Sequence, residues 1–141
     1  MAHPEPVQIP IAEADYNAWG ALLSGIQDAW SKGDLMRMKR FVTPEMLGYF
    51  SEQLSANASR GVENRVEDVT LTKGDVEEAW EENGFEYVTA RLRWTARDYT
   101  VRAGSNQLVE GDLQRAAEAT ELWTFVRTHG GQWLLSAVQQ V

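Results

Sequence analysis

The sequence contains no cysteine. It therefore forms no disulfide, carries no thiol nucleophile and cannot build a thiolate metal site. Histidine is nearly absent too, because there are only 2, and His3 lies in a proline-rich start while His129 lies in a glycine turn. A zinc or iron centre built on imidazole ligands is therefore not expected, and the sequence predicts no metal and no cofactor.

Positive charge is also scarce. The chain has 13 lysine and arginine residues against 21 aspartate and glutamate residues, which gives a formal net charge of −8 at pH 7. Such an acidic surface repels nucleic-acid phosphates, so a nucleic-acid partner is not expected. The main basic cluster is MRMKR at residues 36–40, which we interpret as the solvated face of a short helix.

Long apolar runs are missing. The start, MAHPEPVQIPIAEA, holds three prolines and is neither a signal peptide nor a membrane span. We expect residues 1–10 to form an extended arm and residues 11–141 a single domain. The chain is 43% hydrophobic and 10% aromatic, which is enough to fill a core or to line a cavity within it.

Helical periodicity is present over the first 60 residues or so. Apolar residues at steps of three and four predict a first helix from about Ile11 to Lys32. Gly33 ends that helix, and a short second helix is predicted over Leu35–Val42. Residues 43–45, Thr-Pro-Glu, predict the start of a third helix that ends near Arg60, because threonine caps a helix and proline suits its first turn.

From Arg65 onward the periodicity is that of strands. The first predicted strand reaches about Glu81, with a bulge or bend at Gly74. The dipeptide at residues 83–84, Asn-Gly, predicts a two-residue hairpin turn that places Trp80 opposite Tyr87.

Three further strands are predicted. The second strand alternates through residues 88–96, and residues 102–112 read as a loop. The third and fourth strands cover about residues 115–128 and 133–141 and are joined by a turn at Gly130 and Gly131. This turn places Val126 opposite Leu135 and Trp123 opposite Val138.

These elements predict an α+β fold. Three N-terminal helices pack on a strongly curved, four-stranded antiparallel sheet, and together they form a cone. The side chains expected around its interior are Leu92, Trp94, Trp123 and Phe125, with two of them pointing away from the other two. They form either a filled core or the lining of a pocket for an acyl chain or an apolar side chain.

A second candidate surface is a docking strip on one face of the first hairpin. It consists of Trp80, Tyr87, Arg91 and Arg93, which could hold an anion or a peptide through cation–π contacts. The alternative is a solvated strand face whose arginines pair with Glu77 or Glu78. The apolar residues on the second face of the sheet also leave a homodimer as an alternative.

Catalysis on such a fold needs an acid or a base inside an apolar cavity. Asp98, Tyr99, Tyr16 and Asp28 are the only side chains that could serve, and each also fits a surface or packing position. The sequence contains no serine-nucleophile motif, phosphate-binding glycine loop or carboxylate cluster with metal spacing. We therefore predict no catalytic residue.

Four stretches carry a resemblance to a known family. They are DLMRMKRFVTPEMLGYFSEQL after the first helix, VEDVTL, ARLRWTARDY and ELWTFVR…WLLSAVQQ. Over Ala14–Val141 they are similar to the Tim44-like domain family, named after subunit 44 of the translocase of the inner membrane, which tethers the mitochondrial protein-import motor. This family belongs to the nuclear transport factor 2-like superfamily of cone-shaped α+β domains.

The resemblance implies a non-enzymatic adaptor domain in membrane-associated protein transport or assembly. The implied partner is a chaperone or an inner-membrane translocase or assembly component. The implied location is a soluble domain at the bacterial cytoplasmic membrane or on the matrix side of the mitochondrial inner membrane. Family members contact the membrane through basic amphipathic helices ahead of the domain. Because IAEADYNAW here is acidic, we expect any anchor to lie outside this chain. The alternative on the same fold is a small-molecule carrier or a cavity enzyme such as an isomerase or dehydratase.

Overall fold

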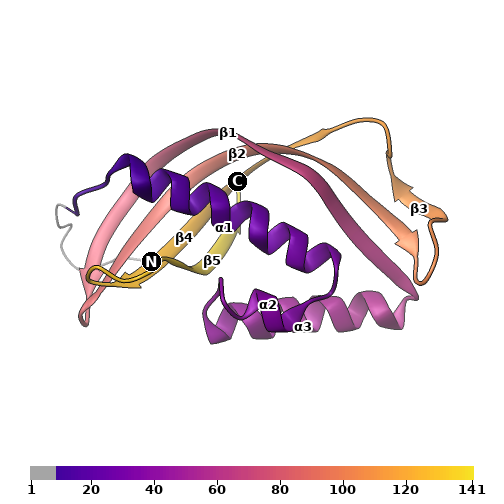
Figure 1. Cartoon of the computed structure of the whole chain (residues 1–141), viewed down its shortest axis with the longest axis horizontal. Helices are drawn as coiled ribbons and strands as arrows, with labels where there is room; N and C mark the ends of the chain where they lie inside the picture. The colour runs from indigo at the N-terminus through magenta and orange to yellow at the C-terminus, as the bar shows by residue number, and fades with distance from the viewer. Residues whose placement is uncertain (1–8) are drawn as a thin grey trace.

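The computed structural model describes residues 9–141, so the predicted arm over residues 1–10, with His3, lies largely outside the described residues. The described part contains three helices and five strands, and α1 begins slightly later than predicted (Figure 1). The elements are, in chain order, α1 (Glu13–Ser31), α2 (Leu35–Met38), α3 (Pro44–Ser59), β1 (Val62–Glu82), β2 (Phe85–Arg102), β3 (Leu108–Gly111), β4 (Ala117–Thr128) and β5 (Leu134–Gln140).

The helix starts follow the capping residues of the sequence. The Thr43 hydroxyl accepts a hydrogen bond from the Met46 backbone N–H at 3.4 Å, and Pro44 occupies the first turn of α3. The Asp34 carboxylate accepts a hydrogen bond from the Arg37 backbone N–H at 3.0 Å and so starts α2. These side chains satisfy backbone donors that a helix leaves free at its first turn.

The sheet is antiparallel, with the strand order β1-β2-β4-β5 and with β3 paired to β2. The prediction of four strands is therefore wrong. Strand β2 continues to Arg102, and its last residues pair with β3, which lies in the segment predicted as a loop. All four residues of β3 are exposed, so the alternation that reveals a half-buried strand is missing there.

The hairpin registers are largely as predicted. Trp80 lies opposite Tyr87 across a turn in which Asn83 and Gly84 have φ values of 54° and 83°. In the second hairpin Trp123 lies opposite Val138, as predicted. The predicted pairing of Val126 with Leu135 is wrong, because a register shift after Thr124 moves Leu134 opposite Val126.

Strand β1 bends strongly along its length. Its pairing with β2 shifts register between Glu67 and Thr70, between Leu71 and Lys73, and between Val76 and Glu78. The predicted irregularity at Gly74 is thus flanked by bulges, while Gly74 itself pairs with Leu92. Bulges increase local twist and bending, and Figure 1 shows the long β1–β2 ribbon arching over the helices.

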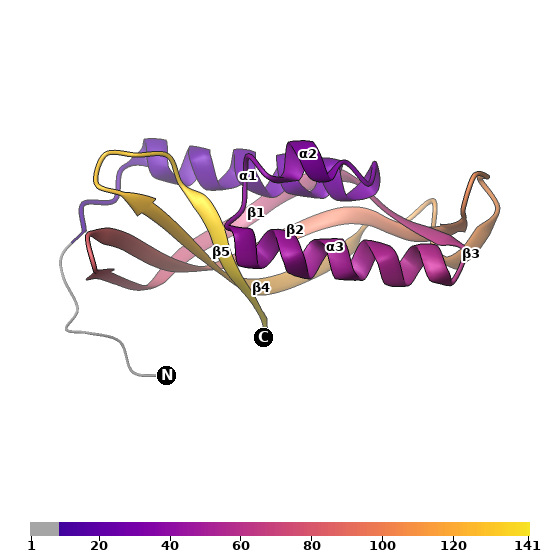
Figure 2. The ribbon, with the colours of Figure 1, turned by 90° about the horizontal axis from the view of Figure 1, so that it is seen from below.

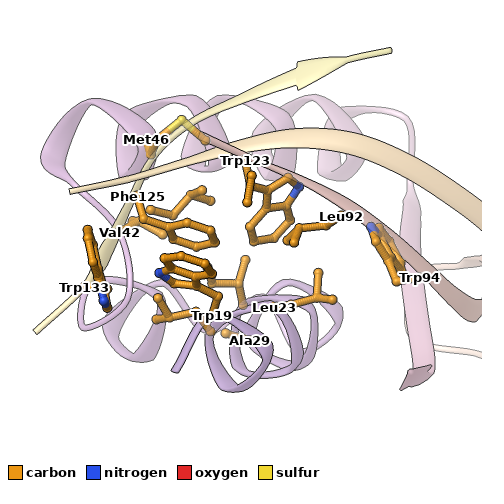
Figure 3. Packing of buried hydrophobic residues seen from close by; sticks show 14 of the residues in the cluster. Trp19, Leu23, Ala29, Val42, Met46, Leu92, Trp94, Trp123, Phe125 and Trp133 are labelled. Carbon is orange, nitrogen blue, oxygen red and sulfur yellow. The ribbon is translucent and has the colours of Figure 1, made fainter. Parts of the chain in front are cut away.

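Helix α1 lies across one face of this sheet and runs at a slant to α3 in Figure 1, whereas both helices follow the long axis of the molecule in Figure 2. The core lies between α1 and the strands (Figure 3). At its centre the Trp19 ring stacks on Phe125, with centroids 5.3 Å apart and planes 7° apart, and Trp133 meets Trp19 edge-on at 5.6 Å. Such aromatic pairs add about 0.5–1.5 kcal/mol each beyond the area that they bury.

Candidate functional site

The four side chains predicted for the interior are all part of the hydrophobic core. Leu92 and Trp123 are 1% exposed, Phe125 is fully buried, and Trp94 is 7% exposed. The prediction that two of them point away from the other two is wrong, because Ala90 lies directly opposite Trp123 and such partners share a face of the sheet. All four pack in one cluster (Figure 3). The sheet interior is therefore filled at these positions.

The two aromatic residues of the predicted docking strip, Trp80 and Tyr87, lie on the face of the sheet that points away from the core. Ala79 packs against the core, so the next residue, Trp80, points the other way. The Trp80 and Tyr87 rings stack with centroids 5.0 Å apart and planes 3° apart. Because Trp80 is only 5% exposed, Tyr87 is the more accessible ring of the pair.

The arginines of the predicted docking strip carry their own counter-ions. The Arg91 Nε donates to Glu77 at 2.6 Å, and the Arg93 Nε lies 3.9 Å from the Glu118 carboxylate. The interpretation of this surface as a solvated strand face therefore describes Arg91 correctly. A docking role for the strip stays a prediction.

The surroundings of two of the candidate acid–base groups shift their pKa values away from neutrality. The Asp28 carboxylate accepts hydrogen bonds from the side chains of Arg37 and Lys32, which lower its pKa. The Tyr99 hydroxyl donates to Glu67 at 2.6 Å, and this carboxylate raises the pKa of Tyr99. Both shifts lead away from the neutral range in which a general acid or base works best. Of the other two candidates, Tyr16 is 39% exposed on α1 and Asp98 is exposed on β2.

A groove of about 1000 Å³ lies elsewhere, between the C-terminal halves of α1 and α3 and the first residues of β1. The residues of α3 explain why it is open. The first turns of α3 carry the large side chains Met46 and Phe50, whereas from Ser51 onward the groove side of the helix carries the small residues Ser51, Ser55 and Ala58 beside Leu54. Small side chains leave space between the helix and its neighbours. The sequence analysis missed this groove, and the change of residue size along α3 is the signal that indicates it.

The floor of the groove is apolar. It contains Trp30 of α1, Leu54 of α3 and, from β1, Val62 and Val66. The Trp30 ring lies 6.0 Å from the Phe50 ring, centroid to centroid, which joins the two helices. The groove thus offers an apolar surface bordered by serine hydroxyls and charged side chains.

Two hydrogen-bonded contacts fix the groove wall where α1 meets β1. The Ser31 hydroxyl donates to the Val66 carbonyl at 3.0 Å and accepts from the Val66 N–H at 2.7 Å. This one side chain therefore satisfies both backbone groups of Val66, which a neighbouring strand would otherwise do. The Trp30 indole N–H donates to the Asn64 Oδ1 at 2.8 Å. The Asn64 Nδ2 in turn donates to the Asp98 Oδ1 at 2.8 Å. This chain of bonds connects the groove floor to an exposed carboxylate on β2.

A buried ionic cluster lies at the other end of α1. The Asp15 Oδ1 accepts hydrogen bonds from Arg127 at 3.0 Å and from the Trp133 indole at 2.9 Å, and Arg127 also donates to Glu86 at 2.7 Å. Burial raises the pKa of Asp15, but the hydrogen bonds from the Ala12 backbone and Trp133 and the charge of Arg127 outweigh it and lower the pKa. The cluster clamps the start of α1 onto both hairpins, and sequence reasoning did not find it.

Among residues 9–141 no helix is both long and apolar enough to span a membrane. The same residues contain no group of three or more acidic or histidine side chains that could hold a metal ion.

Comparison with known proteins identifies the chain's relatives. A model of the Tim44-like domain family matches residues 16–140. The intermembrane space region of the chloroplast protein ARC6 is similar, with a TM-score of 0.56 and 15% identity over 94% of this chain and 100% of that chain. A conserved protein from Planctomyces limnophilus DSM 3776 reaches a TM-score of only 0.43, with 15% identity over 92% of this chain and 100% of that chain. No curated protein sequence matches. At 15% identity the likeness to ARC6 establishes the fold alone.

Proposed function

The chain belongs to the Tim44-like domain family, and from this membership we propose that it is a non-enzymatic adaptor that binds a protein segment in the groove between α1, α3 and β1. The resemblance noted in the sequence is confirmed by the family match over residues 16–140. The family associates the chain with membrane-linked protein transport or assembly. The adaptor role and the groove as its binding site are our proposals.

The open groove is the observation that carries this proposal. Its volume of about 1000 Å³ could hold several side chains of a peptide. Several side chains that line the groove are exposed, among them Ser24, Lys32 and Ser55, so a segment of a larger molecule could enter from outside. An enclosed cavity would instead favour a small ligand, since such sites bury most of the ligand surface.

The composition of the groove also favours a peptide. Apolar residues of the floor, such as Trp30 and Leu54, suit apolar side chains of a partner. The hydroxyls of Ser51 and Ser55 can make hydrogen bonds at the border. A centre of apolar side chains within a polar rim is the usual anatomy of a protein–protein contact.

Further parts of the proposal rest on the family alone. We propose that the partner is a chaperone or an inner-membrane translocase or assembly component. We also propose that the chain acts at the inner membrane as part of a larger protein whose anchor lies outside these residues. A homodimer through the sheet is a weaker proposal, because the middle of the outer sheet face carries the ion pair of Arg91 with Glu77.

Site-specific photo-crosslinking in native membranes tests the adaptor role. A photoreactive phenylalanine analogue replaces Ser55, which lines the groove, in the full-length protein. The matched control carries the analogue at Glu52, an exposed residue of the same helix outside the groove lining. We expect position 55 to give a discrete protein adduct, identified by mass spectrometry as a membrane or chaperone component. Equal labelling at both positions would contradict the proposal.

A further inference from the structure

Asp98 differs from the other acidic side chains near the groove. Among residues 9–141 its hydrogen-bonding partner is the neutral amide of Asn64, at 2.8 Å. No arginine, lysine or histidine among those residues forms an ion pair with it. Each of the other carboxylates close by has a cationic partner, and these pairs are Asp28 with Lys32, Glu63 with Arg65, and both Glu67 and Asp68 with Arg97.

The side chain of Asp98 lies on the same face of the sheet as the groove floor. Asp98 pairs with Val66 across β1 and β2, and directly paired residues project to the same face. Val66 lines the groove, as does Asn64. Asp98 itself is exposed and does not line the groove, but its carboxylate is hydrogen-bonded to Asn64, which does.

One oxygen of this carboxylate is already held by a hydrogen bond before any ligand binds. The Asn64 amide holds one carboxylate oxygen and also donates to the Tyr99 carbonyl at 3.2 Å and to the Thr100 hydroxyl at 3.3 Å. The Trp30 indole N–H holds the other end of the same amide at 2.8 Å. A fixed charge loses little side-chain freedom when it binds a partner, which favours binding.

We propose that Asp98 is the receptor for a lysine or arginine side chain of the protein segment that occupies the groove. This inference rests on the proposed function, because it names the chemistry of the segment at that site. The apolar stem of the basic residue would lie along Trp30 and Val66, and its charged end would reach the free oxygen of Asp98. The net charge of −8 attracts cationic segments over a longer range.

Two substitutions, each of which removes one negative charge, distinguish this role of Asp98 from a general effect of the chain's negative charge on binding. Asp98→Asn removes the charge and keeps an oxygen that can accept the hydrogen bond from Asn64. Glu52→Gln removes one negative charge from the exposed side of α3, outside the groove lining. Thermal unfolding of each variant verifies that it is folded, and the isosteric change at position 98 makes loss of the fold unexpected.

Selection from a random dodecapeptide display library supplies the probe. We expect the unmodified chain and Glu52→Gln to enrich peptides with lysine or arginine at a fixed distance from an apolar residue, and Asp98→Asn to lose the preference for the basic residue. Enrichment of groove-binding peptides without lysine or arginine would overturn the role of Asp98 and leave the proposed function standing. If Ser55→Trp, which fills the groove, binds the selected peptides as well as the unmodified chain does, the peptides bind elsewhere and both proposals fail.

Affinity measurements with the best selected peptide give the second readout. We expect Asp98→Asn to weaken binding about fivefold or more, as for loss of a partly desolvated ion pair, and Glu52→Gln to change it by less than about twofold. The effect of Asp98→Asn should shrink as sodium chloride is raised, because salt screens the ion pair. Equal effects of the two variants would overturn the inference.

Discussion

Replacing Asp15 by alanine tests the clamp at the start of α1. The Asp15 carboxylate accepts three hydrogen bonds, from the Ala12 backbone at 2.8 Å, from the Trp133 indole at 2.9 Å and from the Arg127 guanidinium at 3.0 Å. Its side chain is 13% exposed, so little water can replace these bonds. In the variant Arg127 stays paired with Glu86, which limits the loss in the free energy of unfolding.

We expect the free energy of unfolding to fall by about 2–4 kcal/mol in Asp15→Ala, which removes two hydrogen bonds from neutral donors to the charged carboxylate and one from the Arg127 guanidinium. Asp15→Asn should lose less, because its amide oxygen can still accept hydrogen bonds. Denaturant titration followed by tryptophan fluorescence gives both values. Asp75→Ala is the control, since Asp75 is exposed and lies 3.7 Å from Lys73, and it should change stability by less than about 0.5 kcal/mol.

The pH dependence of this loss follows from the lowered pKa of Asp15. A carboxyl whose pKa is lower in the folded chain than its ordinary value of 3.8 stabilises the fold above that value. The contribution disappears as the pH falls through the folded-state pKa. The difference in the free energy of unfolding between the unmodified chain and Asp15→Ala should therefore be largest near neutral pH and should disappear in acid. A loss below about 1 kcal/mol at pH 7, or a gap that widens in acid, would refute the reasoning.

Three further changes test the groove and the sheet end. Ser31→Ala removes both hydrogen bonds to Val66 and should cost about 1–2 kcal/mol in denaturant unfolding, and an unchanged midpoint would contradict the strand-partner role of this hydroxyl. Gly111→Ala places a methyl group 2.6 Å from a backbone oxygen of β2 at a φ of 93°, so we expect β3 to detach and its amides to lose protection from hydrogen exchange. Gly48→Ala is the control, because there is open space around Gly48. Equal protection of the β3 amides in the two variants would contradict the expectation. Ser55→Trp should block peptide binding with less than about 0.5 kcal/mol lost, because Ser55 is exposed, and retained affinity would place the binding site elsewhere.

Local signals were sufficient to predict that three helices and the first hairpin form, although α2 ends at Met38 rather than at the predicted Val42. The cap at Thr43, the helix end at Gly33 and the turn at Asn83 depend on residues close in sequence, and each is found in the structure. Strand β3 was missed because its residues bury no side chain and gain order only by pairing with the end of β2. The register error in β5 has a similar cause, since a single bulged residue leaves no mark in the pattern of apolar residues.

The groove and the ionic cluster depend on tertiary packing. The groove exists because small residues of α3, such as Ser51 and Ala58, face α1 and β1 after folding, and an isolated serine in a helix has no such meaning in the sequence. Asp15 and Arg127 are 112 residues apart, so no local pattern connects them. Conversely, the sequence leaves Leu92 and Trp94 as either core or pocket lining, because alternation shows that a face is buried without showing what covers it.

NMR spectroscopy of the 141-residue chain with the best selected peptide tests the central claim, that the groove receives a protein segment. The indole N–H of Trp30 and the side-chain amide of Asn64 give resolved signals joined by one hydrogen bond at the groove floor. We expect both signals to shift on binding, while the indole signals of Trp19 and Trp123 in the core stay in place. Shifts confined to the outer sheet face around Tyr87, with Trp30 and Asn64 unchanged, would contradict it.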